Sequence, residues 1–234
     1  MVVAVQVLRY VPPEYQNDVF AGGVADIITA IKLPASLLSK WIAFSTGDID
    51  LRSVQLSLEQ WVKLAAAICQ ALPGTVQALH LNMAHSGDGL KVAMSALQSI
   101  VGHTTHLQSL SLHRIGPRAE NLPLLYQLFS ECPGSLEKLL LDIQYNVYGM
   151  RSLYVQEKTS IFAAVAQMHG LRELHMPQWR ACMSGDCEGD YAHIEVCEPL
   201  RRTPALKICV PKSDLGTASL KRCSTYGLDF IGFE

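Results

Sequence analysis

Residues 105–114 read THLQSLSLHR, a stretch whose three leucines fit either one face of a helix or the inward face of a short strand. The stretch alone does not decide between the two. Nearly the same pattern returns at three other places in the chain, as TVQALHLN at 75–82, SLEKLLLD at 135–142 and GLRELHMP at 170–177. A pattern that recurs at a roughly constant interval indicates a repeat architecture.

Each repeat is predicted to contain one short strand. The apolar residues at the predicted strand centres lie 29–37 residues apart, and they are Val5, Ile42, Leu79, Leu110, Leu139, Leu174 and Ile208. In every case the residue two positions later is also apolar. Alternation with a period of two is typical of a strand that buries one face.

A helix is predicted before most of these strands. The segment before the strand has apolar residues at helical spacing and then a helix breaker, and the breakers are Pro34, Pro73-Gly74, Gly102, Pro133-Gly134 and Gly170. Strands that alternate with helices run parallel, and stacked repeats bury one continuous core between a strand layer and a helix layer. We therefore expect Leu110 and Leu112 to point toward the helices and Ser111 and His113 to point away from them.

The pattern L-x-x-L-x-L occurs at residues 107–112 and 136–141, at 171–176 with Met176 in the last position, and at 76–81 as a close variant that begins with Val76, and the chain thereby resembles the leucine-rich repeat family. The repeat length is similar to that of the ribonuclease-inhibitor-like and F-box-associated types. The resemblance implies an α/β solenoid, a horseshoe of about six to seven repeats with parallel strands on its concave face and helices on its convex face. This solenoid is expected to span residues 1–211, and residues 212–234 are expected to form an irregular C-terminal cap.

The chain departs from the family pattern after the last leucine of the motif. The family places Asn or Cys three residues later, where this chain has Ala84, Ile115, Gln144 and Trp179. A doubly wound α/β sheet would also alternate strands and helices. Against it, no glycine-rich phosphate loop follows a predicted strand, and the nearest candidate, HSGDGLK at 85–91, matches neither nucleotide-binding pattern.

The outward residues of the predicted strands define a candidate binding surface. Neighbouring parallel strands lie about 4.8 Å apart, so residues at equivalent positions form columns across the sheet. The residues that these columns assign to the surface are Trp41, His80, Asn82, Ser111, His113, Lys138, Asp142, Glu173 and His175. Because the leucine-rich repeat family usually binds proteins on this face, the resemblance implies a non-catalytic protein–protein interaction module with a partner that the sequence does not identify.

A metal-dependent function is the alternative carried by one segment near the C-terminus. Its four potential zinc ligands are Cys182, Cys187, His193 and Cys197. Their spacing differs from that of zinc fingers and zinc knuckles, and the ordinary interpretation is a polar loop that leads into a helix with Cys197 packed inside. No cofactor is therefore expected. The acidic residues Asp186, Glu188 and Asp190 do not fit a calcium loop, whose closing position holds Cys197.

The predicted outward surface also contains residues that suggest an enzymatic function as an alternative. His80, Ser111, His113 and Asp142 are expected to gather there, and serine, histidine and aspartate together can activate a hydroxyl group. An open sheet face offers neither an oxyanion hole nor exclusion of water. The ordinary interpretation of these four residues is a polar recognition surface.

Composition narrows the possible partners and compartments. The 234 residues are 49% hydrophobic and 17% charged, and the net charge of −2 does not favour a nucleic-acid partner. The most apolar segment, residues 19–38, is interrupted by Asp26, Lys32 and Pro34, so no membrane span is expected. Seven cysteines without a disulfide framework predict the cytoplasm or another reducing intracellular compartment.

The N-terminal strand predicted around Val5 is expected to be an uncovered edge. Val3, Val5 and Val7 alternate, and only Arg9 adds a charge nearby. An unpaired strand edge is a template for pairing with another chain. We therefore expect self-association or a further subunit at this edge, and the alternative is that PPEYQND at 12–18 folds back over it.

Overall fold

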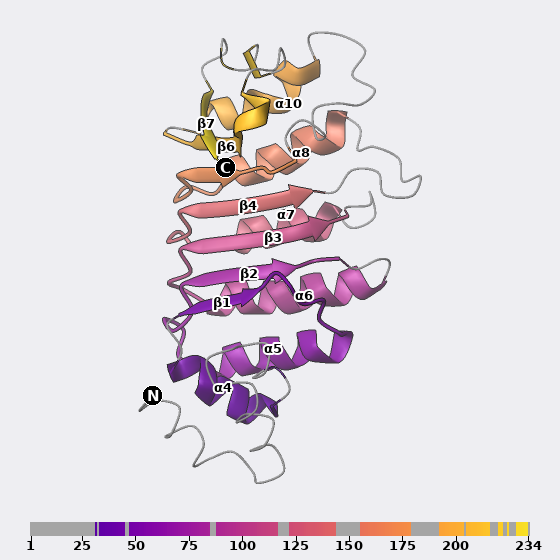
Figure 1. Cartoon of the computed structure of the whole chain (residues 1–234), viewed down its shortest axis with the longest axis vertical. Coiled ribbons are helices and arrows are strands. Elements are labelled where there is room, and N and C mark those ends of the chain that lie inside the picture. Colours follow the sequence, from indigo (N-terminus) through magenta and orange to yellow (C-terminus); the bar gives the residue numbers. More distant parts are fainter. Residues whose placement is uncertain are drawn as a thin grey trace.

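The computed structural model is an α/β structure in which one seven-stranded parallel sheet alternates with helices (Figure 1). The residues that the structure describes are 31, 33–44, 47–84, 88–116, 122–143, 155–178, 192–203, 205–215, 220–221, 224 and 228–233. The strands follow the order of the chain, from β1 (Asp48–Leu51) and β2 (Ala78–Asn82) at one end to β7 (Asp229–Phe233) at the other. The sheet is open, because β1 and β7 each pair with a single described strand.

The strands between these ends pair in the register that the sequence predicts. They are β3 (Ser109–Ile115), β4 (Lys138–Ile143), β5 (Glu173–His175) and β6 (Lys207–Pro211). Leu79 pairs with Leu110, Leu110 with Leu139, Leu139 with Leu174 and Leu174 with Ile208, all in parallel. The prediction of a parallel, repeated strand–helix arrangement is thereby confirmed.

The helices form a second layer on one face of the sheet (Figure 1). They are α4 (Ala35–Phe44), α5 (Leu58–Gln70), α6 (Asp88–His103), α7 (Leu122–Glu131), α8 (Val155–Ala166) and α10 (Ala192–Arg201). Each helix packs on the helix of the next repeat. Within the described ranges, none of the helices has the length and apolar character needed to cross a membrane.

The core lies between the two layers and is built by the alternation that the sequence contains. Leu110, Leu112, Leu139 and Leu174 on the strands are fully buried, as are Leu97 and other apolar residues on the helices. Burial of this kind is the main stabilising contribution that stacked repeats obtain from one another. The start of α5 is fixed locally as well, because the Ser57 hydroxyl and the Gln60 side chain form a reciprocal capping box.

A row of backbone carbonyl groups links successive repeats at the start of the strands. The carbonyl oxygen of Gln77 accepts from the N–H groups of Gln108 and Ser109, at 2.8 and 3.1 Å. The same two-donor arrangement recurs at the carbonyl groups of Gly47, Gln108, Glu137 and, with one donor, Arg172. Because one backbone position plays one role in each repeat, the strands begin at a common line across the sheet.

The first strand of the described sheet is not the one that the sequence predicts. The sequence predicts Ile42 as a strand centre, but Ile42 lies with Trp41 in α4, where both are buried. The prediction that Trp41 lies on the outward surface is therefore wrong. The apolar residues Leu38, Trp41 and Ile42 recur at helical spacing and not in alternation, which explains the helix. The strand of this repeat is β1, in which Ile49 pairs with Leu79.

The C-terminal segment contains a strand as well. Residues 212–234 were predicted to be irregular, but Lys212–Asp214 form the 3-10 helix η2 and β7 pairs in parallel with β6. Phe230 takes the inward position beside Ile208. The strand predicted around Val5 lies outside the described residues, and so does the uncovered strand edge predicted there.

Gly170 marks a close approach between the turns of two repeats and gives the first prediction. A Cβ atom at Gly170 would overlap the carbonyl oxygen of Gly134 and lie 3.2 Å from that of Leu136. We expect Gly170→Ala to lower the free energy of unfolding by about 1–3 kcal/mol, because backbone must move to admit the methyl group. The matched control is Gly102→Ala in α6, where the methyl group meets nothing within 4 Å.

The control substitution should raise stability by about 0.4–1 kcal/mol, since alanine restricts the unfolded chain without a clash. Urea denaturation of the three proteins measures both changes. Equal stability of the two variants would contradict the described contact between the turns.

Candidate functional site

The outward face of the sheet, turned away from α5–α8, is the candidate functional site. We define the outward face by the side chains on β1–β6 that alternate with those facing the helices, namely Asp48, Asp50, Ala78, His80, Asn82, Ser109, Ser111, His113, Lys138, Leu140, Asp142, Glu173, His175, Lys207 and Cys209. Eight of the nine residues predicted for the binding surface are among them, and Trp41 is the exception. The columns hold because the strands are parallel and in register.

His80 on β2 joins the three strands β1, β2 and β3 on this face. Its Nδ1 atom lies 2.7 Å from the Ser111 hydroxyl on β3, and its Nε2 atom lies 3.5 Å from an Asp48 carboxylate oxygen on β1. The predicted meeting of His80 and Ser111 is therefore present, with Asp48 as an acid that the sequence analysis missed. Asp48 was missed because the sequence predicts the strand of this repeat around Ile42, whereas the strand in the structure is β1.

This serine–histidine–aspartate chain has the residue types of a nucleophilic site but the burial of a structural one. Ser111 is only 5% exposed, whereas a nucleophile must reach a substrate atom. The Asp48 side chain is 58% exposed, so water screens its effect on the imidazole. The arrangement is best suited to holding the His80 ring in one orientation on the surface.

His113 and Asp142 lie at the end of the face, where β3 is irregular. The register between β3 and β4 shifts between Leu112 and Ile115, and Arg114 there has a positive φ of 58°. The Asp142 carboxylate accepts from the Arg114 N–H at 3.2 Å, which stabilises this bulge. Burial is the main cause that lowers the pKa of His113, opposed by the nearby Asp142 carboxylate.

Two polar atoms at this bulge are buried and have no hydrogen-bond partner among the described residues. They are Nε2 of His113 and the second carboxylate oxygen of Asp142. Beside them, Asn82 is buried and bonded to backbone, donating to the Arg52 carbonyl and accepting from the Ala84 N–H. The Asn82 side chain therefore holds the backbone at Arg52 and Ala84. His113 and Asp142 each keep one buried atom that can still form a hydrogen bond.

A second polar cluster occupies β5 and its neighbours. The Glu173 carboxylate lies 3.1 Å from Nε2 of His175 and 3.4 Å from Nζ of Lys138. The hydrogen bond with His175, and secondarily the charge of Lys138, lower the pKa of Glu173. Burial raises the pKa of the neighbouring Cys209 thiol, and the Glu173 charge raises it further.

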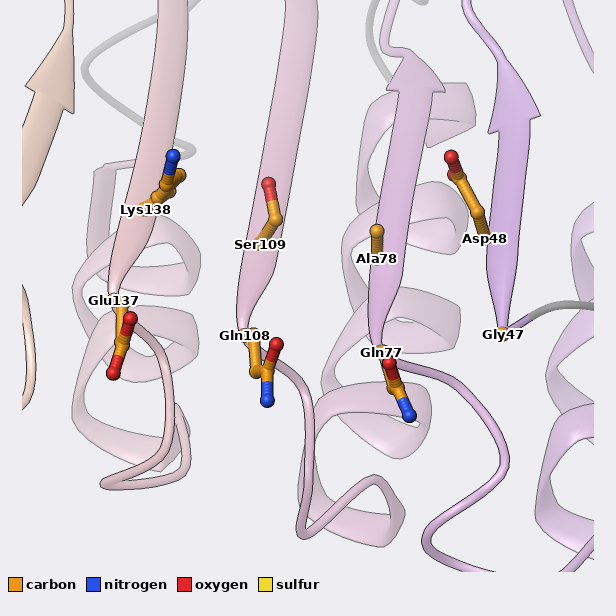
Figure 2. A pocket seen from close by; sticks show the side chains of 8 residues that line it. All are labelled: Gly47, Asp48, Gln77, Ala78, Gln108, Ser109, Glu137 and Lys138. Carbon is orange, nitrogen blue, oxygen red and sulfur yellow. The ribbon is translucent and has the colours of Figure 1, made fainter.

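A shallow pocket of about 200 Å³ crosses the start of four strands. Figure 2 shows its lining side chains, Asp48, Ser109 and Lys138 on the strands and Gln77, Gln108 and Glu137 at the turns that enter them. Three of the lining residues, Gly47, Ala78 and Ser109, are small. The pocket thus offers amide, carboxylate and ammonium groups above a backbone that a ligand can approach closely.

The entry row of this pocket, which we define as Gln77, Gln108 and Glu137, was not among the predicted site residues, although the sequence contains a pattern that identifies it. Gln77, Gln108 and Glu137 each stand immediately before the first residue of a strand. A column defined one position earlier than those considered would have contained all three. Their side chains are at least partly exposed, which suits hydrogen bonding to an incoming group.

The predicted metal segment lies mostly outside the described residues. Cys182 and Cys187 fall there, as do Asp186, Glu188 and Asp190. His193 belongs to α10, and Cys197 is buried in the same helix. Metal binding by this segment stays a prediction. No disulfide joins the cysteines of the described residues.

The chain was compared with family models, curated proteins and solved structures. No family model, no curated protein and no solved structure matches the chain.

Proposed function

We propose that the chain is a non-catalytic, leucine-rich-repeat-type interaction module that binds a partner protein on the outward face. The observation that carries the proposal is the polar surface that six parallel strands present in register, with a pocket across its entry row. Solvent-accessible polar groups on a rigid scaffold are what specific recognition requires. The horseshoe shape implied by the sequence resemblance belongs to this proposal.

The chemistry of the face favours a polar segment of the partner. Asp48 stands at one end of the pocket and Lys138 at the other, with the side-chain amides of Gln77 and Gln108 between them. A partner segment that places a cation near Asp48 and a carboxylate near Lys138 would match this charge pattern. The amides would donate to and accept from the segment that lies between these two charges.

The buried position of Ser111 argues against the enzymatic alternative. Its hydroxyl is already bonded to His80, and the side chain is 5% exposed. The same contact fits the proposed role, because an oriented imidazole is a better recognition group than a mobile one. His80 would then contact the partner without chemical change.

Charge reversal at Lys138 tests the proposal against a matched control on the helix layer. Lys138 and Lys91 have side chains that are 56% and 55% exposed, and each forms one ion pair, with Glu173 and with Asp88. We expect Lys138→Glu to weaken partner binding by at least about tenfold, because it sets two carboxylates side by side on the interface. Lys91→Glu should leave the affinity within about twofold.

The measurement uses each immobilised protein to capture its partner from native extract, followed by titration with the captured protein. Circular dichroism confirms that both variants keep the fold. Equal affinities of the two variants, or a loss confined to Lys91→Glu, would place the binding surface elsewhere.

A further inference from the structure

We propose that Glu173, His175 and Cys209 form a zinc site on the outward face. Their ligand atoms, one carboxylate oxygen, one imidazole nitrogen and one thiol sulfur, all lie within 4.8 Å of one another. This is the group of potential metal ligands that the described residues bring together. The inference does not rest on the proposed protein-binding function, and it concerns different residues from the cysteine segment at 182–197.

The strand geometry explains why the three residues converge. Glu173 and His175 are two positions apart on β5 and therefore share its outward face, while Cys209 on β6 pairs directly with His175. Two ligands come from one strand and the third from its hydrogen-bonded neighbour. The backbone that holds all three is part of the sheet, so few degrees of freedom remain to be ordered when an ion binds.

The distances are compatible with a single ion after small side-chain movements. Ligand atoms around a tetrahedral zinc ion, bound at about 2.0–2.3 Å, lie about 3.3–3.8 Å apart. The Glu173 oxygen and the His175 nitrogen are already 3.1 Å apart. Rotation of the partly exposed Glu173 and His175 side chains, which are 32% and 28% exposed, can bring both atoms toward the buried Cys209 sulfur.

The ligand set selects the kind of ion. A thiol disfavours magnesium and calcium, which prefer oxygen ligands, whereas sulfur, nitrogen and oxygen together suit zinc. A thiolate and a carboxylate also balance the two charges of Zn²⁺, so the bound site would be electrically neutral. Three protein ligands leave a fourth position toward solvent for a water molecule.

The surroundings of the cluster fit a bound ion as well. The Phe233 ring of β7 lies 5.9 Å from the His175 ring of β5, with β6 as the strand between them in the sheet. Lys138 is the competing cation, with its Nζ atom 3.4 Å from the Glu173 carboxylate. Because its side chain is 56% exposed, Lys138 can turn into solvent when zinc takes its place.

The test is a zinc titration of the full chain. The purified protein is reduced, stripped with a chelator and titrated with zinc in competition with a chromophoric chelator. We expect Glu173→Gln and His175→Gln each to weaken zinc binding by at least about 100-fold, since loss of a ligand should cost no less than loss of a residue that supports one. Lys138→Gln, which removes the competing cation, should bind zinc at least as tightly as the unchanged protein.

Cobalt substitution identifies the sulfur ligand. Bound Co²⁺ should give a thiolate-to-cobalt charge-transfer band that is lost in Cys209→Ser and kept when Cys182 and Cys187 are both replaced by serine. If Cys209→Ser does not fold, the two β5 variants still decide the question. Absence of zinc binding, zinc affinity unchanged by both β5 variants, or a band that follows Cys182 and Cys187 instead of Cys209 would overturn the proposal.

Discussion

Replacing Leu139 with alanine is expected to lower the free energy of unfolding by about 2–5 kcal/mol. Leu139 is fully buried on β4 and pairs with Leu110 on one side and Leu174 on the other. The truncation removes apolar contacts from the middle of the core and leaves a cavity that the neighbouring strands cannot fill without losing their register. Urea denaturation of the variant measures the loss.

The next residue along the chain is the control for this prediction. Leu140 has the same side chain but lies on the outward face and is only partly buried. Leu140→Ala should cost about 1 kcal/mol or less, as is usual away from the core. A strand shifted by one residue would exchange the two positions, so a larger loss for Leu140→Ala than for Leu139→Ala would contradict the described register.

Trp61→Ala is expected to cost about 3–5 kcal/mol and tests the helix layer in the same way. Trp61 is fully buried in α5, on the face that also carries Leu64 and Ile68. The adjacent Val62 is 59% exposed, so Val62→Ala should change stability by no more than about 0.5 kcal/mol. Thermal unfolding of both variants compares them, and similar losses would mean that α5 is rotated from its described orientation.

The sequence predicted the middle of the fold well because one physical rule acts there repeatedly. In β2, β3 and β5 the apolar residues alternate within a run that follows a helix breaker, as in Leu110 and Leu112. Parallel pairing in register then determines which outward residues become neighbours. This is why the contact of His80 with Ser111 could be expected without a structure.

The two ends of the sheet were harder to predict for different reasons. β1 is only four residues long, and its outward positions hold Asp48 and Asp50, a residue type with low strand propensity, while the nearby α4 offers a longer apolar run. In β7, Gly232 interrupts the alternation after Phe230. In both cases the partner strand decides the outcome, because pairing with a formed sheet compensates a weak local preference.

Parts of the candidate site depend on backbone detail that a residue pattern does not contain. The positive φ of Arg114 and the shifted register beside it allow the Asp142 carboxylate to accept a hydrogen bond from the Arg114 N–H. The sequence pattern predicts Asp142 only as a cross-strand neighbour of His113. The cluster of Glu173, His175 and Cys209 was visible only in part. Its two β5 members were assigned to the surface, and Cys209 was not recognised as the third.

Photo-crosslinking from single positions is the most direct test of the claim that the outward face binds the partner. A benzophenone side chain is introduced at Gln77 or Gln108 on the entry row of the pocket, or at Val62 or Lys91 on the helix layer, four positions that are all exposed. The account predicts that the captured partner crosslinks from the two pocket positions and from neither helix position. Crosslinks from Val62 or Lys91 with none from Gln77 and Gln108 would contradict it.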